Sequence, residues 1–201
     1  MGHDWTNVTG AVAGDADGYK TSVNMANGAY ALDLTAPTFG ARHVTLVRTR
    51  DGAGGTEDTP GTITLVGIGP NGPQTEIMIP GAHGVTVTSK YFYKSLTSAT
   101  QAAWVVDAGL TADTIVIGWD NVNVVAVGQG TLHAVTINVA GASAIYVGDS
   151  RGKIATIPAN QAAGSHFLYD INYSGYLEIV PAAVASDITV AHSGSLPTTY
   201  A

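Results

Sequence analysis

The segment GIGPNG, residues 67–72, has the glycine spacing of a dinucleotide-binding loop. It follows the apolar segment 62–68, which has the composition of a β-strand. A dinucleotide site also needs a helix after the glycines, because the amides at the helix N-terminus bind the pyrophosphate. Here Pro70 and Pro73 interrupt the pattern, and the alternating segment 74–80 is typical of another strand. The motif therefore predicts the turn of a β-hairpin, and we expect no cofactor.

The segment GDADGY, residues 14–19, is similar to the start of a calcium-binding loop. Asp15, Asp17 and Gly18 have the right types and spacing. An EF-hand loop also needs a glutamate at its twelfth position, which is Ala26 when counted from Asp15. An Asx turn explains these residues more simply. We therefore expect a turn here and no metal ion.

The other residue types that carry catalysis are scattered along the chain. The six histidines stand singly, with neither H-x-H nor H-E-x-x-H spacing. There is no G-x-S-x-G elbow, and RGK at 151–153 lacks the rest of a phosphate-binding loop. Glu76 and Glu178 lie on predicted strands and are candidates for a glycosidase pair, but exposed strand positions explain them better. The sequence therefore predicts that the protein is not an enzyme.

Aromatic residues on the predicted strands allow two interpretations. They can form a platform that binds sugars, or they can fill the core and the cross-strand pairs of a β-sandwich, which is the commoner use. The residues concerned are Tyr91, Phe92, Tyr93, Trp104, Trp119, Tyr169, Tyr173 and Tyr176.

Short β-strand signals recur over most of the chain. About a dozen runs rich in β-branched residues are separated by Gly, Pro, Asn and Asp. In HVTLVR, Val44 and Leu46 would share one face of a strand, and Thr45 and Val47 the other. Helical periodicity is nearly absent. The pattern predicts an all-β protein built from antiparallel β-sandwich or barrel modules.

Two segments of the chain are alike and indicate two β-modules in tandem. TADTIVIGW at 111–119 and ASDITVAHS at 185–193 each have a small residue, an aspartate and a β-branched alternating run. We expect the first module over residues 31–121 and the second over 122–201.

Residues 1–30 have weaker periodicity and much Gly, Ala, Asn and Asp. They predict an irregular N-terminal arm that is anchored by aromatic side chains. An arm of this kind can cover neighbouring surface when it orders on binding. The candidate interface residues are therefore Trp5, Tyr19 and Tyr30, and deletion of 1–27 is expected to abolish binding while leaving the β-fold intact.

The composition is unusual for a solitary domain. Charged residues make up 11% of the 201 residues, against about 25% in average domains. Surfaces poor in charge lack the groups that resist association, which indicates that the protein is part of a larger assembly. The net charge of −7 and the absence of a basic patch argue against nucleic-acid binding. No apolar run approaches 18 residues, so we expect no membrane span.

Two segments resemble modules that recur in virion proteins of tailed bacteriophages. Residues 62–100 have a strand, a Gly/Asn turn, a Thr-Glu-x-Ile strand, TVTS and an aromatic YF pair. Residues 131–193 contain LHAVTINVA, IYVGD, KIATI and DITV in the order of the second module. Tyr176-Leu177 stand where that module usually has Gly-Leu. Together the two segments cover about half of the 201 residues.

The resemblance implies a structural component of the virion and brings no catalytic residues. The expected role is a capsid decoration or cement protein, with the major capsid protein as partner and a homo-oligomer, a trimer, as its own state. Neck, collar or tail components are the alternative, as is a module that binds glycans on the virion surface. We expect neither nucleic acid nor membrane as a partner.

Overall fold

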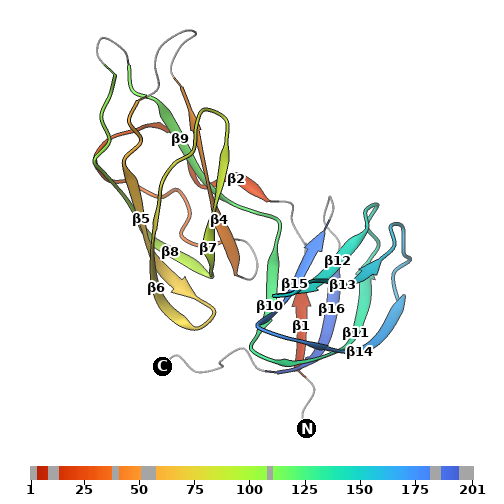
Figure 1. The fold of residues 1–201 in the computed structure, drawn as a ribbon. Coiled ribbons are helices and arrows are strands. Elements are labelled where there is room, and N and C mark those ends of the chain that lie inside the picture. The colour runs from red at the N-terminus through yellow and green to blue at the C-terminus, as the bar shows by residue number, and fades with distance from the viewer. Residues whose placement is uncertain are drawn as a thin grey trace. The chain divides into compact units, whose positions relative to one another are not determined.

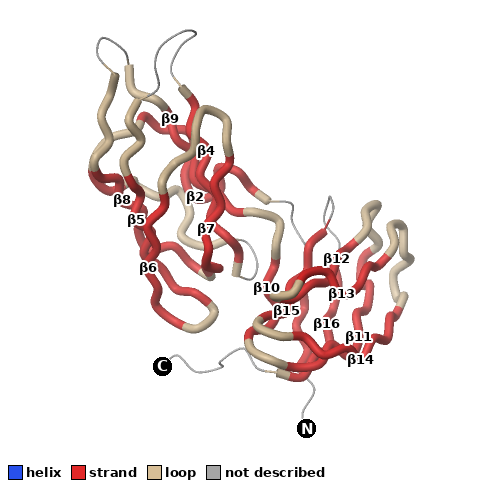
Figure 2. The backbone as a smooth tube through the Cα atoms, in the orientation of Figure 1, coloured by secondary structure: helices blue, strands red, loops and turns tan. Residues whose placement is uncertain are grey.

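The computed structural model shows strands and no helix in the part of the chain that it describes (Figures 1 and 2). The all-β prediction is confirmed: the strands form four antiparallel sheets. The described residues are 4–8, 14–37, 41–50, 58–107, 111–181 and 187–194.

The chain divides into two compact units, one nested in the other along the sequence. We call residues 15–37 and 43–120 the inserted unit, and residues 1–14, 38–42 and 121–201 the host unit. The strands of the inserted unit are β2 (Asp15–Asn24), β3 (Gly28–Ala29), β4 (Arg42–Thr49), β5 (Thr62–Gly69), β6 (Gly72–Met78), β7 (Thr86–Tyr93), β8 (Ser95–Ala102) and β9 (Thr114–Trp119). The strands of the host unit are β1 (Asp4–Val8), β10 (Asn123–Val127), β11 (Gly130–Val139), β12 (Ile145–Asp149), β13 (Gly152–Ile157), β14 (His166–Tyr173), β15 (Tyr176–Pro181) and β16 (Asp187–Ser193).

Both units have the same strand order. The inserted unit has sheets β2-β9-β4-β7 and β3-β8-β5-β6, and the host unit has β1-β16-β11-β14 and β10-β15-β12-β13. When the eight strands of each unit are numbered in chain order, both give 1-8-3-6 and 2-7-4-5. This is the arrangement of a jelly roll, in which two sheets of four strands pack face to face. The inserted unit enters the chain between the first and second strands of the host unit.

The boundaries therefore differ from the expected ones. Residues 1–30 do not form a separate arm over their described parts: β1 pairs with β16 in the host unit, and β2 pairs with β9 in the inserted unit (Figure 1). The module expected at 31–121 lacks its first two strands, β2 and β3, and the one expected at 122–201 lacks its first strand, β1. The cause is the jelly-roll topology, which joins the first strand to the last. The two similar segments at 111–119 and 185–193 contain β9 and β16, the last strands of their units.

Each unit has its own hydrophobic core between its two sheets. Val44 and Leu46 of β4 share one face of the strand, as predicted, and both are fully buried in the inserted core. Val135 of β11 and Val190 of β16 lie opposite each other and are fully buried in the host core. Each such side chain contributes about 1.5–3 kcal/mol when fully buried, so the sandwiches are stabilised chiefly by this apolar contact.

The segment GIGPNG forms the turn between β5 and β6, so the hairpin prediction is confirmed. Gly69 pairs with Gly72 at the end of the ladder. Gly72 has a φ of 117°, a conformation that side chains rarely adopt. The residues after the turn form β6 and not a helix.

Buried polar groups hold three loops together at one end of the inserted unit. The guanidinium of Arg48 donates to the carbonyl of Gly81 at 3.0 Å and to that of Asp58 at 2.6 Å, and it lies 3.4 Å from the carboxylate of Asp113. The Asp58 carboxylate accepts the backbone N–H groups of Asp107 and Asp113. Arg48, Asp58 and Asp113 are all buried, so these bonds replace the water that the groups lose on folding.

Replacement of Arg48 tests this network. Arg48→Met should lower the free energy of unfolding by about 3 kcal/mol or more, because it leaves the buried Asp113 carboxylate without its cation. Urea unfolding followed by intrinsic fluorescence measures the change. Lys90→Met removes an exposed cation from the same unit and should change stability by about 0.5 kcal/mol at most. Equal effects of the two substitutions would contradict this account.

A histidine joins β1 to the rest of the host unit. His192 on β16 is buried, and its Nε2 lies 2.9 Å from Oγ1 of Thr6 on β1. Its Nδ1 lies 3.1 Å from the carbonyl oxygen of Gly194, so Nδ1 carries the proton and Nε2 accepts the Thr6 hydroxyl. Burial lowers the pKa of His192 below its ordinary 6.5, against the smaller opposing effects of the Gly194 carbonyl and Asp4.

The stability of the host unit should therefore depend on pH. Above pH 6.5 the imidazole is neutral in both states; below 6.5 the unfolded chain binds the proton more readily, so stability falls as the pH falls. Thermal unfolding from pH 7.5 to 5.5 measures this loss. His192→Gln should reduce the pH dependence, whereas His166→Gln, at an exposed position, should retain it. A pH dependence that is the same in all three proteins would rule out His192 as its source.

Candidate interaction surface

One outer sheet face of the inserted unit carries no charged side chain in its paired strands. It is the outer face of β3-β8-β5-β6, whose register gives the outward positions: Thr64 of β5, for example, lies opposite Ile77 of β6 and Thr100 of β8. The neighbouring positions Ile63 and Leu65 point into the core. We call this surface the β5–β6 face. Its outward residues are Ala29, Thr62, Thr64, Val66, Ile68, Pro73, Thr75, Ile77, Ser95, Ser98, Thr100 and Ala102, and Ile79 continues it beyond β6.

Large aliphatic side chains on this face are exposed to solvent. Ile77 and Ile79 are 66% and 62% exposed, and Val66 and Ile68 are also exposed. The remaining outward positions are Thr, Ser, Ala and Pro. Single exposed aliphatic residues are ordinary, but a run of them with no charge between them is typical of an interaction surface.

The fold does not dictate this chemistry, because the equivalent face of the host unit is charged. On β10-β15-β12-β13, Gly148 lies opposite both Lys153 and Glu178. The Lys153 ammonium lies 4.6 Å from the centre of the Tyr146 ring. The two sheets occupy the same place in the two jelly rolls. The host sheet has an acid, a base and an aromatic ring on its outer face, whereas the sheet of the inserted unit has only uncharged residues there.

The host unit's other outer face also carries charged and polar side chains, beside the exposed Trp5 and Leu168. On β1-β16-β11-β14, His133 Nδ1 lies 2.8 Å from a carboxylate oxygen of Asp170, and Asn138 donates to Asp187. In the inserted unit's other sheet, β2-β9-β4-β7, the strand β7 presents Lys90 to solvent. The β5–β6 face is therefore distinct from the other sheet surfaces of the described chain.

Side chains from β6 cover the edge of the neighbouring strand β7. The Glu76 carboxylate accepts the backbone N–H groups of Lys90 at 2.7 Å and Tyr91 at 3.2 Å. The Gln74 amide donates to the carbonyl of Phe92 at 2.7 Å. Burial, and to a lesser degree the charge of Glu76, raise the pKa of Tyr93. These bonds occupy backbone groups of β7 that would otherwise be open to strand pairing. They also connect β6, an edge strand of the β5–β6 face, to β7.

Glu76 therefore has a structural role here. Its suggested glycosidase partner, Glu178, belongs to the host unit, where its carboxylate lies over Gly148.

The expected interface residues lie in three different environments. Trp5 on β1 is 63% exposed. Tyr19 is fully buried and packs edge-on against Trp119, with 5.0 Å between the ring centres. Tyr30 is also buried, and its hydroxyl donates to Gln101 at 3.3 Å. Tyr19 and Tyr30 thus belong to the core of the inserted unit and are not available to a partner, which corrects their assignment as interface residues.

Most residues of the suggested sugar platform are also in the cores. Trp119, Tyr93 and Tyr173 are buried, and Trp104 and Tyr169 pack against the cores from their edges. Trp119, Tyr93 and Tyr173 are closed to solvent, whereas Trp104 and Tyr169 are partly buried against the cores. The structure thus supports the core interpretation for these five residues.

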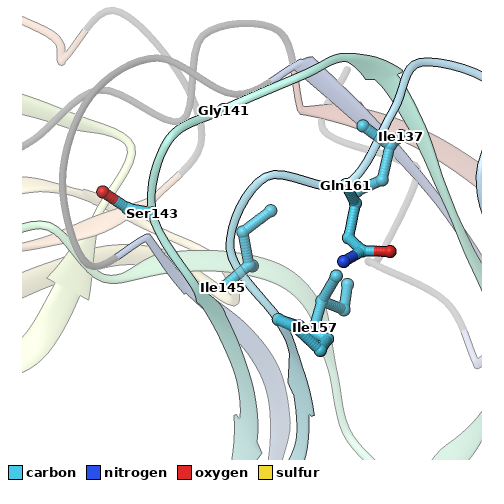
Figure 3. A pocket seen from close by; sticks show the side chains of 7 residues that line it. Ile137, Gly141, Ser143, Ile145, Ile157 and Gln161 are labelled. Atoms are coloured by element: carbon cyan, nitrogen blue, oxygen red, sulfur yellow. The ribbon is translucent and has the colours of Figure 1, made fainter.

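The described residues contain no cluster of three or more metal-ligating side chains. In the segment at 14–19, the backbone N–H of Asp17 donates to Asp15 Oδ1 at 3.4 Å, which is the bond of the predicted Asx turn. A small hollow in the host unit is lined by Ile137, Ile145, Ile157 and Gln161, among others (Figure 3). Its volume of about 10 Å³ suits one water molecule and no larger ligand.

The β5–β6 face was missed in the sequence because its residues belong to ordinary strand patterns. In TITLVGI, Ile63 and Leu65 alternate with Thr64 and Val66, so apolar residues occur on both faces. Only one face of an outer sheet can contact the core of its own sandwich. Apolar residues on both faces of β5 were the available signal, but the pairing of β5 was needed to use it.

Comparison with known proteins identifies no relative of this chain. No protein-family model, no curated protein and no solved structure matches it. The described residues also include no helix long and apolar enough to cross a membrane.

Removal of the Glu76 carboxylate tests the edge contact. Glu76→Ala should increase amide hydrogen exchange at Lys90 and Tyr91, because their N–H groups lose their acceptor. Thr75→Ala, at the adjacent outward position, should leave exchange at these amides unchanged. Unaltered exchange in Glu76→Ala, measured by NMR, would show that the contact does not protect the edge.

Proposed function

We propose that this protein is a structural subunit of a bacteriophage virion, and specifically a capsid decoration protein. The observation that carries the proposal is the β5–β6 face, an uncharged and partly aliphatic surface on a chain with 11% charged residues. The similarity of residues 62–100 and 131–193 to virion modules gives the biological setting. The jelly-roll topology is compatible with this role, since it occurs in viral capsid proteins, but it also occurs in lectins and cupins.

Such a subunit acts by adding buried surface to the head. Full burial of an isoleucine contributes about 1.5–3 kcal/mol, so Ile77 and Ile79 are each worth about 1–2 kcal/mol from their exposed parts. Contacts of this size are weak singly and become strong when many subunits bind one lattice. The partners in this proposal are the major capsid protein and further copies of the chain.

The N-terminal residues do not act as a separate clamp in this proposal. Because β1 and β2 are the first strands of the two jelly rolls, deletion of 1–27 would remove a strand from each unit. The deletion would therefore damage the fold, so it cannot serve as a test of binding.

A neck, collar or tail component is the alternative, because it would use the same uncharged surface. The two locations differ in copy number. A decoration protein occurs in proportion to the capsomers of the head, whereas a neck or tail component occurs as one closed ring or a few rings. A glycan-binding module has less support, since the buried aromatics leave few rings for a sugar to stack on.

Purified virions of the phage that encodes this chain provide the test. Quantitative mass spectrometry and a density map should find the chain on the outside of the head, in numbers that scale with the capsomers. The internal reference is the major capsid protein of the same particles. A copy number of a single ring would assign the chain to the neck or tail, and its absence from washed particles would refute a structural role.

A further inference from the structure

We propose that a second copy of this chain covers the β5–β6 face, so that two such faces pack against each other around a two-fold axis. This inference names the partner at the surface on which the proposed function rests. It requires the chain to be an assembly subunit but does not depend on where in the particle it is found.

Charge complementarity identifies the partner surface. A charged partner would lose the hydration of its charges against the β5–β6 face and find no opposite charge there, since the paired strands offer only Thr, Ser, Ala, Pro, Val and Ile. Glu76 of β6 does not point outward, since its carboxylate binds the backbone of β7, and Lys94 lies in the turn between β7 and β8. The surface that fits is therefore another uncharged, aliphatic sheet. Among the sheet surfaces described here, only the same face on another copy has this chemistry.

The net charge of the chain favours the same arrangement. Two copies with a charge of −7 each repel at long range, and contact through faces that carry carboxylates would add local repulsion. The β5–β6 face lets the copies meet without opposing like charges. The equivalent face of the host unit carries Glu178 and Lys153, so contact through that face would bring like charges together.

The size of the face is sufficient for a reversible dimer. With strands about 4.8 Å apart and about 3.3 Å per residue, the 2, 8, 8 and 7 residues of β3, β8, β5 and β6 cover roughly 400 Å². Two copies would bury roughly 800 Å², which is in the range of weak and transient interfaces, so the dimer should be weak. Threonine and serine between the aliphatic residues are small, so two sheets can approach to the usual separation of about 10 Å.

Pairing through the edge of β7 is less favoured. Glu76 and Gln74 already occupy backbone groups of β7 at the edge of its sheet. A second copy adding a strand there would have to displace these bonds. Packing through the β5–β6 face needs no bond within the unit to break.

Opposite charges placed at Ile77 test the proposal. Analytical ultracentrifugation over a range of concentrations should show a reversible dimer for the unaltered protein. Ile77→Lys and Ile77→Glu should each weaken it by about tenfold or more, because the introduced charge is buried without a partner. Mixed in equal amounts, the two variants should dimerise again. Leu168→Lys and Leu168→Glu, at a 75% exposed position on β14, are the matched controls and should dimerise like the unaltered protein.

Thermal unfolding of each variant checks that the fold is retained, which the exposure of Ile77 leads us to expect. A protein that stays monomeric at high concentration, a trimer without a dimer, or a dimer unaffected by both Ile77 variants would overturn the inference. If the chain is found on virions but the dimer ignores Ile77, only the inference fails. If the dimer behaves as expected but virions lack the chain, only the proposed function fails.

Discussion

The pairing of the first strand with the last is the constraint on which both units depend. β2 pairs with β9 and β1 pairs with β16, and each pair brings together segments that are far apart in the sequence. In the host unit, the bond between Thr6 and His192 joins residues 186 positions apart. The inserted unit must therefore fold within a chain whose two ends also have to meet. Contacts of such separation close slowly, because the entropy of the loop is lost before the pairing stabilises it.

The two jelly rolls share one topology but differ in the side chains on their surfaces. The comparison shows which positions the fold requires to be apolar and which are free to vary. Both jelly rolls need inward-facing aliphatic residues at alternate positions, and both have them. The outward positions are not needed for closure, so they are free to differ. The host unit has Lys153, Glu178 and Tyr146 on one sheet, whereas the inserted unit has Val66, Ile68 and Ile77 on the equivalent sheet. This difference is the reason to assign an interaction to the inserted unit.

Local patterns in the sequence predicted local structure well. The alternation of HVTLVR correctly placed Val44 and Leu46 on one face of a strand, and the prolines near GIGPNG correctly indicated a hairpin. Thr45, expected on the opposite face, is also buried, whereas Val47 on that face is only partly buried.

The parts that depend on distant residues were not predictable in this way. The Asp and Gly residues of 15–24 are typical of irregular chain, yet this segment forms β2. Gly18 is needed there because a side chain at this position would collide with the Trp119 ring. The nested order of the units depends on strand partners, which no single segment encodes. The β5–β6 face likewise became visible only when the register showed which residues share a side.

The central claim is that the β5–β6 face is covered in the assembled protein. Hydroxyl-radical labelling of side chains, read by mass spectrometry, tests it directly when dilute monomer is compared with concentrated or particle-bound protein. The account predicts that Ile77 and Ile79 lose most of their labelling on assembly while Leu168 keeps its labelling. Undiminished labelling of Ile77 and Ile79 in the assembled state would contradict it.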